Sequence, residues 1–188
     1  MPLITEKTYD KLNFKEIALE KGEYEICTFK NCDFSNADLS LFKFTESTFI
    51  NCNLSLAKLT NTSFRDVTFT DCKLMGLHFD SCNAFNLSFR FEGCMLNHSS
   101  FYKLKLKNIV LKKCQLHEVD FTESDLTAAT FDNCDLTNAK FEHSILEKAD
   151  FRSAFNFSID PESNKMKKAK FSSQNIQALL YKYDLHIE

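Results

Sequence analysis

Phe and Leu residues recur at every fifth position over most of this chain. In the clearest stretch, residues 114–151, the repeated large side chains are Leu116, Phe121, Leu126, Phe131, Leu136, Phe141, Leu146 and Phe151. A small or branched residue stands two positions before each of them. A period of five is neither the 3.6 residues of an amphipathic helix nor the 2 of a strand. The pattern therefore predicts a repeat architecture.

The same spacing runs from Phe14 to Phe89, where only Tyr24 and Ala84 depart from Phe or Leu at the repeated position. At Phe89 the spacing slips by two residues. We place the two extra residues in Arg90–Gly93, because a glycine tolerates the positive φ of a corner or bulge. The repeat then resumes and continues into the stretch described above.

Six of the eight cysteines reveal a second, longer period. Successive cysteines in the series Cys32, Cys52, Cys72, Cys94, Cys114 and Cys134 are 20, 20, 22, 20 and 20 residues apart. The single step of 22 spans the two-residue slip. Four five-residue units therefore form one coil, and the cysteines stack in one column. A coil cannot bury its own Phe and Leu side chains, so stacked coils share one continuous apolar interior.

We interpret the cysteines as buried free thiols. The chain has no CxxC pair, and Ala or Ser takes the same place in other repeats, whereas a structural zinc site needs four ligands in a tetrahedron. The first residues lack the basic and apolar regions of a signal peptide, and no apolar run approaches the ~18 residues of a membrane span. We therefore expect a cytoplasmic protein that has no metal and no membrane partner.

The repeat weakens beyond Phe151, and we expect an irregular coil around residues 160–164. Ser172 or Ser173 then fits the N-cap of a helix. Apolar residues follow at i, i+3, i+4 and i+7, namely Ile176, Leu179, Leu180 and Tyr183. This spacing predicts an amphipathic α-helix that caps the last coil and joins two copies into a homodimer. The expected segments are a lead-in (1–13), a repeat domain (14–171) and a C-terminal helix and tail (172–188).

The repeat resembles that of the pentapeptide-repeat family, commonly written A(D/N)LXX. Ala37-Asp38-Leu39-Ser40-Leu41 and Ala149-Asp150-Phe151-Arg152-Ser153 match it outright. The resemblance covers about residues 14–171, and it implies an all-β, right-handed quadrilateral parallel β-helix. The tail from Ala169 to Leu180 looks like the ending of the Qnr and MfpA proteins, the topoisomerase-binding branch of the family, in which a C-terminal helix pairs two rods.

Charge forms bands along the chain. Five lysines crowd one coil within residues 103–113, whereas residues 114–160 hold ten acidic residues against three basic ones. One interpretation is that neighbouring coils of opposite charge attract each other. The other is an acidic band that binds a partner, formed by Glu118, Asp120, Glu123, Asp125, Asp132, Asp135, Glu142 and Asp150.

The resemblance implies a DNA mimic that binds a type II topoisomerase, DNA gyrase or topoisomerase IV, and that protects it from quinolones. The alternative is a scaffold or interaction module for an unknown protein partner. The net charge of −3 gives no overall basic footprint, so we expect no direct contact with nucleic acid.

Catalysis finds no support in the sequence. The five histidines fall at outward positions or in the tail, and no hydrolase, nucleotide-binding or zinc-protease motif is present. We expect no enzymatic activity, no cofactor and no small-molecule substrate.

Overall fold

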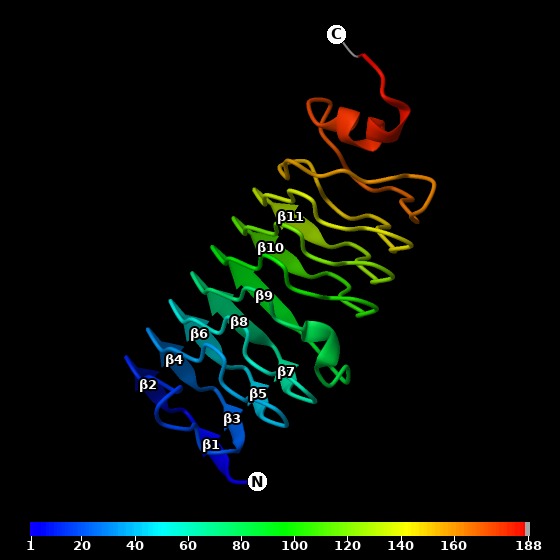
Figure 1. Cartoon of the computed structure of the whole chain (residues 1–188). Coiled ribbons are helices and arrows are strands. Elements are labelled where there is room, and N and C mark those ends of the chain that lie inside the picture. Colours follow the sequence, from blue (N-terminus) through cyan, green and yellow to red (C-terminus); the bar gives the residue numbers. More distant parts are fainter. Residues whose placement is uncertain (187–188) are drawn as a thin grey trace.

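The chain forms a rod of stacked coils in the computed structural model, which describes residues 1–186 (Figure 1). The short strands are β1 (Leu3–Thr5), β2 (Thr8–Asp10), β3 (Glu23–Glu25), β4 (Thr28–Lys30), β5 (Lys43–Thr45), β6 (Thr48–Ile50), β7 (Ser63–Arg65), β8 (Val67–Thr70), β9 (Phe89–Glu92), β10 (Val110–Lys112) and β11 (Thr130–Asp132). All strand pairs are parallel. The all-β parallel solenoid that the repeat predicts is confirmed.

Each coil has four sides. The first side carries the sheet β1-β3-β5-β7, and the second carries the sheet β11-β10-β9-β8-β6-β4-β2. Isolated parallel bridges link successive coils on the third side, as between Asn53 and Lys73, and on the fourth, as between Ser100 and Asp120. Single bridges continue the first side toward the C-terminus, where Lys105, Asp125, Ile145 and Lys165 pair in succession.

Corners between sides fall two residues after each inward Phe or Leu. The backbone there is left-handed, with φ of 54° at Asn31, 52° at Asn51, 52° at Asp71 and 66° at Gly93. Asn, Asp and Gly adopt this conformation at the lowest cost. Gly93 therefore occupies an ordinary corner, which corrects the expectation that it marks an insertion.

The residue before each inward side chain often closes the turn. The Oδ1 atom of Asp33 accepts a hydrogen bond from the backbone N–H of Ser35 at 2.9 Å, and Asp120 does the same for Thr122 at 2.9 Å. Such Asx turns satisfy a corner N–H that the neighbouring coil does not reach. This is the physical reason for Asp or Asn at the second position of the repeat.

Stacked aromatic rings fill the interior. On the second side, Tyr9, Phe29, Phe49 and Phe69 lie one above the other, with ring centroids 4.9, 4.7 and 5.0 Å apart. The cysteine column lies beside them, and each Sγ contacts carbonyl oxygens, as Cys52 does with that of Phe29 at 3.3 Å. All eight cysteines are buried and free, in agreement with the prediction.

The two extra residues lie earlier than the sequence suggested. Phe91 pairs with both Phe69 and Leu111 on the second side, so Phe91, not Phe89, continues the five-residue phase. The chain instead bulges out over residues 83–88, where Phe85 is 66% exposed. Phe89 still reaches the core and packs against Phe64, with ring centroids 5.5 Å apart.

The first coil begins before Phe14. β1 and β2 pair in register with β3 and β4, so the expected lead-in over residues 1–13 contributes two strands to the solenoid. At the other end, Phe157 and Ile159 fill the interior of the irregular coil. Asn164, also buried, accepts a hydrogen bond from the N–H of Ser144 at 2.8 Å.

The C-terminal α-helix expected from the apolar spacing is not formed. The segment makes two short 3-10 turns instead, η2 (Ile176–Leu179) and η3 (Tyr181–Tyr183). Asn175 explains the difference, because its side-chain nitrogen donates to the carbonyl oxygens of Phe151 and Ala154, both at 3.1 Å. A segment this short has little helical stability of its own, so contacts with the last coil decide its shape. Residues 187 and 188 of the expected helix and tail lie outside the described residues.

Within residues 1–186, no helix has the length and apolar character needed to cross a membrane.

Candidate interaction surfaces

Most residues of the expected acidic band are engaged by basic or polar side chains. Several of the pairs join neighbouring coils, as between Lys103 and Glu123 at 3.4 Å, and Lys107 and Asp125 at 3.3 Å. Further contacts join Glu118 to His98 at 3.4 Å, Asp135 to His117 at 3.0 Å, Asp150 to Arg152 at 2.7 Å and Asp132 to the hydroxyl of Ser153 at 3.0 Å. The basic coil within residues 103–113 therefore neutralises part of the acidic coil that follows it.

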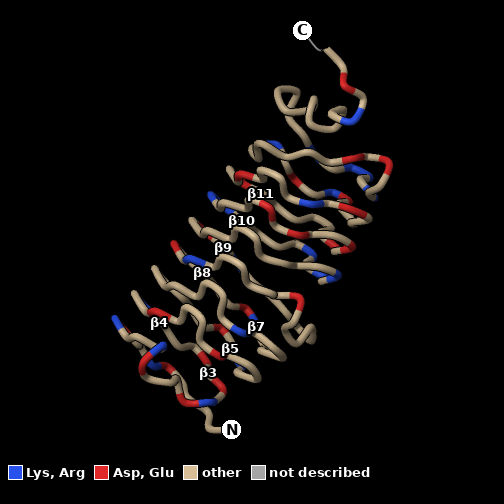
Figure 2. The backbone as a smooth tube through the Cα atoms, in the orientation of Figure 1, with Lys and Arg blue, Asp and Glu red and all other residues tan. Residues whose placement is uncertain are grey.

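The acidic residues are also distributed around the rod. Asp125 lies on the first side, Asp132 on the second, Asp135 on the third and Asp120 on the fourth. Acidic and basic segments intersperse along the tube in Figure 2. The expected band thus encircles the rod and does not cover one side of it.

Asp120, Asp125, Asp135 and Asp150 share a structural role that sequence reasoning missed. Each precedes an inward side chain and accepts the N–H two residues later, as Asp33 does. For Asp135, burial alone would raise the pKa, but hydrogen bonds from Thr137, Asn156 and His117 hold it at about 2. The repeat motif itself, with Asp or Asn before the inward residue, was the signal for this role.

The C-terminal segment closes the rod and exposes apolar side chains at its tip. Leu179 packs against the core, whereas Ile176 is 45% and Tyr183 50% exposed. Lys182 ties the segment to the irregular coil through Asp160 at 2.8 Å and Glu162 at 2.7 Å. The structure thus separates the four expected dimerisation residues: Leu179 faces the core, Leu180 is half-buried, and the other two face outward.

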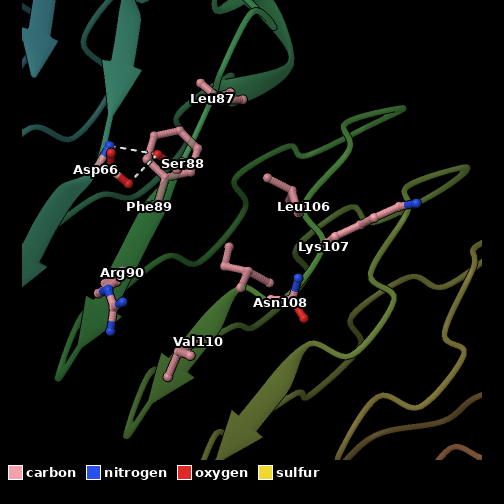
Figure 3. Close-up of a pocket in the computed structure, with 10 residues that line it drawn as sticks. Asp66, Leu87, Ser88, Phe89, Arg90, Leu106, Lys107, Asn108 and Val110 are labelled. Atoms are coloured by element: carbon pink, nitrogen blue, oxygen red, sulfur yellow. Dashed lines mark hydrogen bonds between the residues drawn. The ribbon is translucent and has the colours of Figure 1, made fainter.

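A shallow groove marks the place where the first side is interrupted. The sheet β1-β3-β5-β7 ends at β7, and the bulge over residues 83–88 crosses the next coil. Figure 3 shows the groove between Leu87, Phe89 and Leu106, with the Ser88 hydroxyl donating to Asp66 at 3.0 Å. Its volume of about 150 Å³ is below the roughly 300 Å³ at which ligand pockets begin.

A lysine-rich segment lies between the acidic coil and the C-terminal segment. Residues 161–170 carry four lysines and a single acidic residue, and the acidic excess of residues 114–160 ends just before them. Lys165 and Lys167 lie on the first side, and Lys168 at the corner that follows. The two-fold axis of a homodimer formed at the tip of the rod would therefore be flanked by lysines.

Among residues 1–186, no group of three or more His, Cys, Asp or Glu side chains is arranged to hold a metal ion.

A model of the pentapeptide repeat region matches residues 23–90 and 87–154, which is more than half of the chain. The chain belongs to the pentapeptide-repeat family. No curated protein matches it in sequence. Among solved structures, a trypsin-treated form of QnrB1, a plasmid-mediated fluoroquinolone resistance protein, is similar with a TM-score of 0.66 at 16% identity, covering 100% of both chains. A second trypsin-treated form has a TM-score of 0.67 at 15% identity, covering 96% of this chain and 98% of that one.

HetL of Nostoc sp. strain PCC 7120, a pentapeptide-repeat protein involved in regulating heterocyst differentiation, has a TM-score of 0.45 at 15% identity, covering 89% of this chain and 86% of that one. At these identities the QnrB1 structures show the fold alone. Membership of the pentapeptide-repeat family accounts for the inward Phe and Leu and for the Asx turns.

Proposed function

We propose that this chain is a non-catalytic rod that binds a type II topoisomerase, either DNA gyrase or topoisomerase IV, at the site for duplex DNA. The observation that carries the proposal is the match to QnrB1 over the whole of both chains. QnrB1 is described as a fluoroquinolone resistance protein, and quinolones act on type II topoisomerases. The proposal therefore includes protection of the enzyme from these drugs.

The acidic residues that remain accessible support this proposal. The carboxylate of Glu142 forms no ion pair or hydrogen bond with any of residues 1–186, and the residue is exposed. Asp120 uses one oxygen for its own turn and has no basic partner within ion-pair distance among the same residues. Both lie on the fourth side. A groove shaped for DNA is positively charged, so attraction to these carboxylates weakens as salt screens it.

The proposal also includes a homodimer formed through the tip of the rod. Ile176, Tyr181, Tyr183 and Leu185 are each 45% or more exposed there. Burying them against a second copy would remove apolar surface from water and double the length of the rod.

A supercoiling assay tests the proposal. Purified gyrase is titrated with the protein, with and without a fluoroquinolone. We expect inhibition of supercoiling by the protein alone, relief of drug inhibition, or both. A double variant, Asp120→Asn with Glu142→Gln, should weaken the effect, because both changes remove fourth-side charge and nearly preserve side-chain shape. Asn also forms Asx turns. Lys58→Gln with Lys73→Gln is the matched control. No response of gyrase or of topoisomerase IV to excess wild-type protein would contradict the proposal.

A second candidate function is a scaffold for a different protein partner. The ion pairs between coils favour it, because charge used to hold coils together is less available to imitate DNA. Negative topoisomerase assays would leave this candidate standing.

A further inference from the structure

The lysine cluster at the end of the solenoid consists of Lys148, Lys165, Lys167 and Lys168, all of them exposed. None of the four forms an ion pair or side-chain hydrogen bond with any of residues 1–186. Elsewhere in the rod, lysines such as Lys103 and Lys112 reach an acid on a neighbouring coil, whereas others, such as Lys30, have no ion pair among the described residues. The cluster differs in that four such lysines lie on two successive coils. The cluster is therefore a positive surface that the fold does not neutralise.

Lys148 and Lys168 are in register on successive coils. Ile145 pairs with Lys165, so Lys148 and Lys168 occupy the same corner of successive coils, both with left-handed backbone. The N–H of Lys148 donates to the carbonyl oxygen of Lys167 at 3.0 Å. Coils of a parallel sheet are ~4.8 Å apart, and like charges in register are destabilising. Two lysines in register, with no acidic side chain to compensate their charge, break this local rule and mark a candidate functional surface.

The acidic residues around the cluster leave its charge in place. Asp150 is held by Arg152 and Lys170, while Asp160 and Glu162 are both bound by Lys182. Glu147 lies on the same side of the rod as Lys167, yet no lysine comes within ion-pair distance of it among residues 1–186. The cluster thus keeps an excess of three positive charges.

The side chains beside the cluster identify the kind of partner. Protein interfaces are depleted of lysine and enriched in aromatic residues, whereas contacts to phosphate use Lys together with Ser, Thr and Asn. Among residues 1–186, no exposed aromatic residue lies on the lysine-bearing sides of these two coils. Phe155 is on the third side, and the cap tyrosines stand at the tip. The absence of stacking surfaces on these sides disfavours single strands, which bind through them.

We infer that this lysine cluster binds the phosphate backbone of duplex nucleic acid. Contact through charge alone makes the binding independent of sequence. The inference replaces the expectation, drawn from the net charge of −3, that the chain makes no direct contact with nucleic acid. It does not depend on binding to a topoisomerase.

Fluorescence anisotropy with a short labelled DNA duplex and no other protein tests the inference. Because four lysines neutralise about four phosphates, log K should fall with log salt with a slope of about −3 to −4 per chain. The triple variant Lys165→Gln, Lys167→Gln and Lys168→Gln should reduce the magnitude of this slope by about 3. The corresponding triple Arg variant keeps the charge and should bind like the wild type.

The matched control changes the same number of exposed lysines in the N-terminal half, with Lys11, Lys30 and Lys73 replaced by Gln. It should retain the wild-type slope. The inference is overturned by absence of duplex binding at about 50 mM salt, where such contacts are strong, or by equal losses in the control. Equal or tighter binding of polyglutamate would overturn it as well, since the surface would then serve an acidic protein. Thermal melts of each variant verify folding.

Discussion

The carboxylate of Asp71 lies against Gly93 in the corner of the next coil, where a Cβ on the glycine would overlap the Asp71 Oδ1 atom. The two residues occupy the corner column that holds Asn31 and Asn51 in earlier coils, where the Asn51 side chain donates to Asn31 at 2.7 Å. Gly93 thus serves close approach as well as its φ of 66°.

We expect Gly93→Ala to lower the free energy of unfolding by about 1–2 kcal/mol, the usual cost of left-handed backbone for a residue with a Cβ. The overlap contributes less, because the Asp71 carboxylate is the end of an exposed, flexible side chain that can rotate away. Asp71→Gly should therefore restore only a small part of the loss, and urea unfolding of the single and double variants measures it. Full recovery in the double variant would show that the overlap, and not the backbone conformation, is the cause.

Phe121 tests the stacked interior. Its ring lies between those of Phe101 and Phe141, with centroids 5.3 and 5.2 Å away, and it is fully buried. Phe121→Ala should cost about 3–5 kcal/mol in the free energy of unfolding, as large-to-small core changes do. Phe85→Ala is the matched control on the exposed bulge and should cost less than about 1 kcal/mol. An unchanged urea midpoint for Phe121→Ala would refute the stacking.

Asp135 should make the free energy of unfolding depend on pH in the acidic range. Its folded pKa of about 2 lies below the ordinary aspartate value of 3.8, so the unfolded state binds the proton more readily. The stabilisation is therefore fully present above about pH 4 and is lost as the pH falls toward 2. Asp135→Asn removes this contribution, so its deficit relative to the wild type should shrink over that pH range. A deficit that stays constant from pH 5 to about 2 would contradict the prediction.

The tip of the rod should decide the oligomeric state. Ile176→Lys together with Leu185→Lys places charge on two side chains that are 45% and 58% exposed, so the fold should persist while a dimer becomes a monomer. Leu56→Lys, at a side chain 61% exposed in the middle of the rod, is the control. Light scattering at micromolar concentration provides the mass. A monomeric wild-type protein would remove the homodimer from the proposed function.

The sequence locates the interruption of the repeat near the C-terminus, but it does not show which side chains pack there. The break between residues 156 and 166 was visible in the repeat, yet Phe157, which helps to fill the interior there, stands outside the five-residue phase. Taken alone, the apolar spacing from Ile176 to Tyr183 fits an α-helix. Asn175, bound to Phe151 and Ala154, converts it into 3-10 turns by a contact more than twenty residues away in sequence.

The sequence by itself determined the repeat. A period of five with inward Phe and Leu admits few ways to bury those side chains, and the cysteine spacing of 20 sets the length of the coil. Only the tertiary structure decided which of Phe89 and Phe91 continues the phase, because both are Phe and the choice depends on pairing with Phe69 and Leu111. It likewise decided which charges are neighbours. Lys103 pairs with Glu123, and Lys148 comes into register with Lys168, only because coils twenty residues apart lie next to each other.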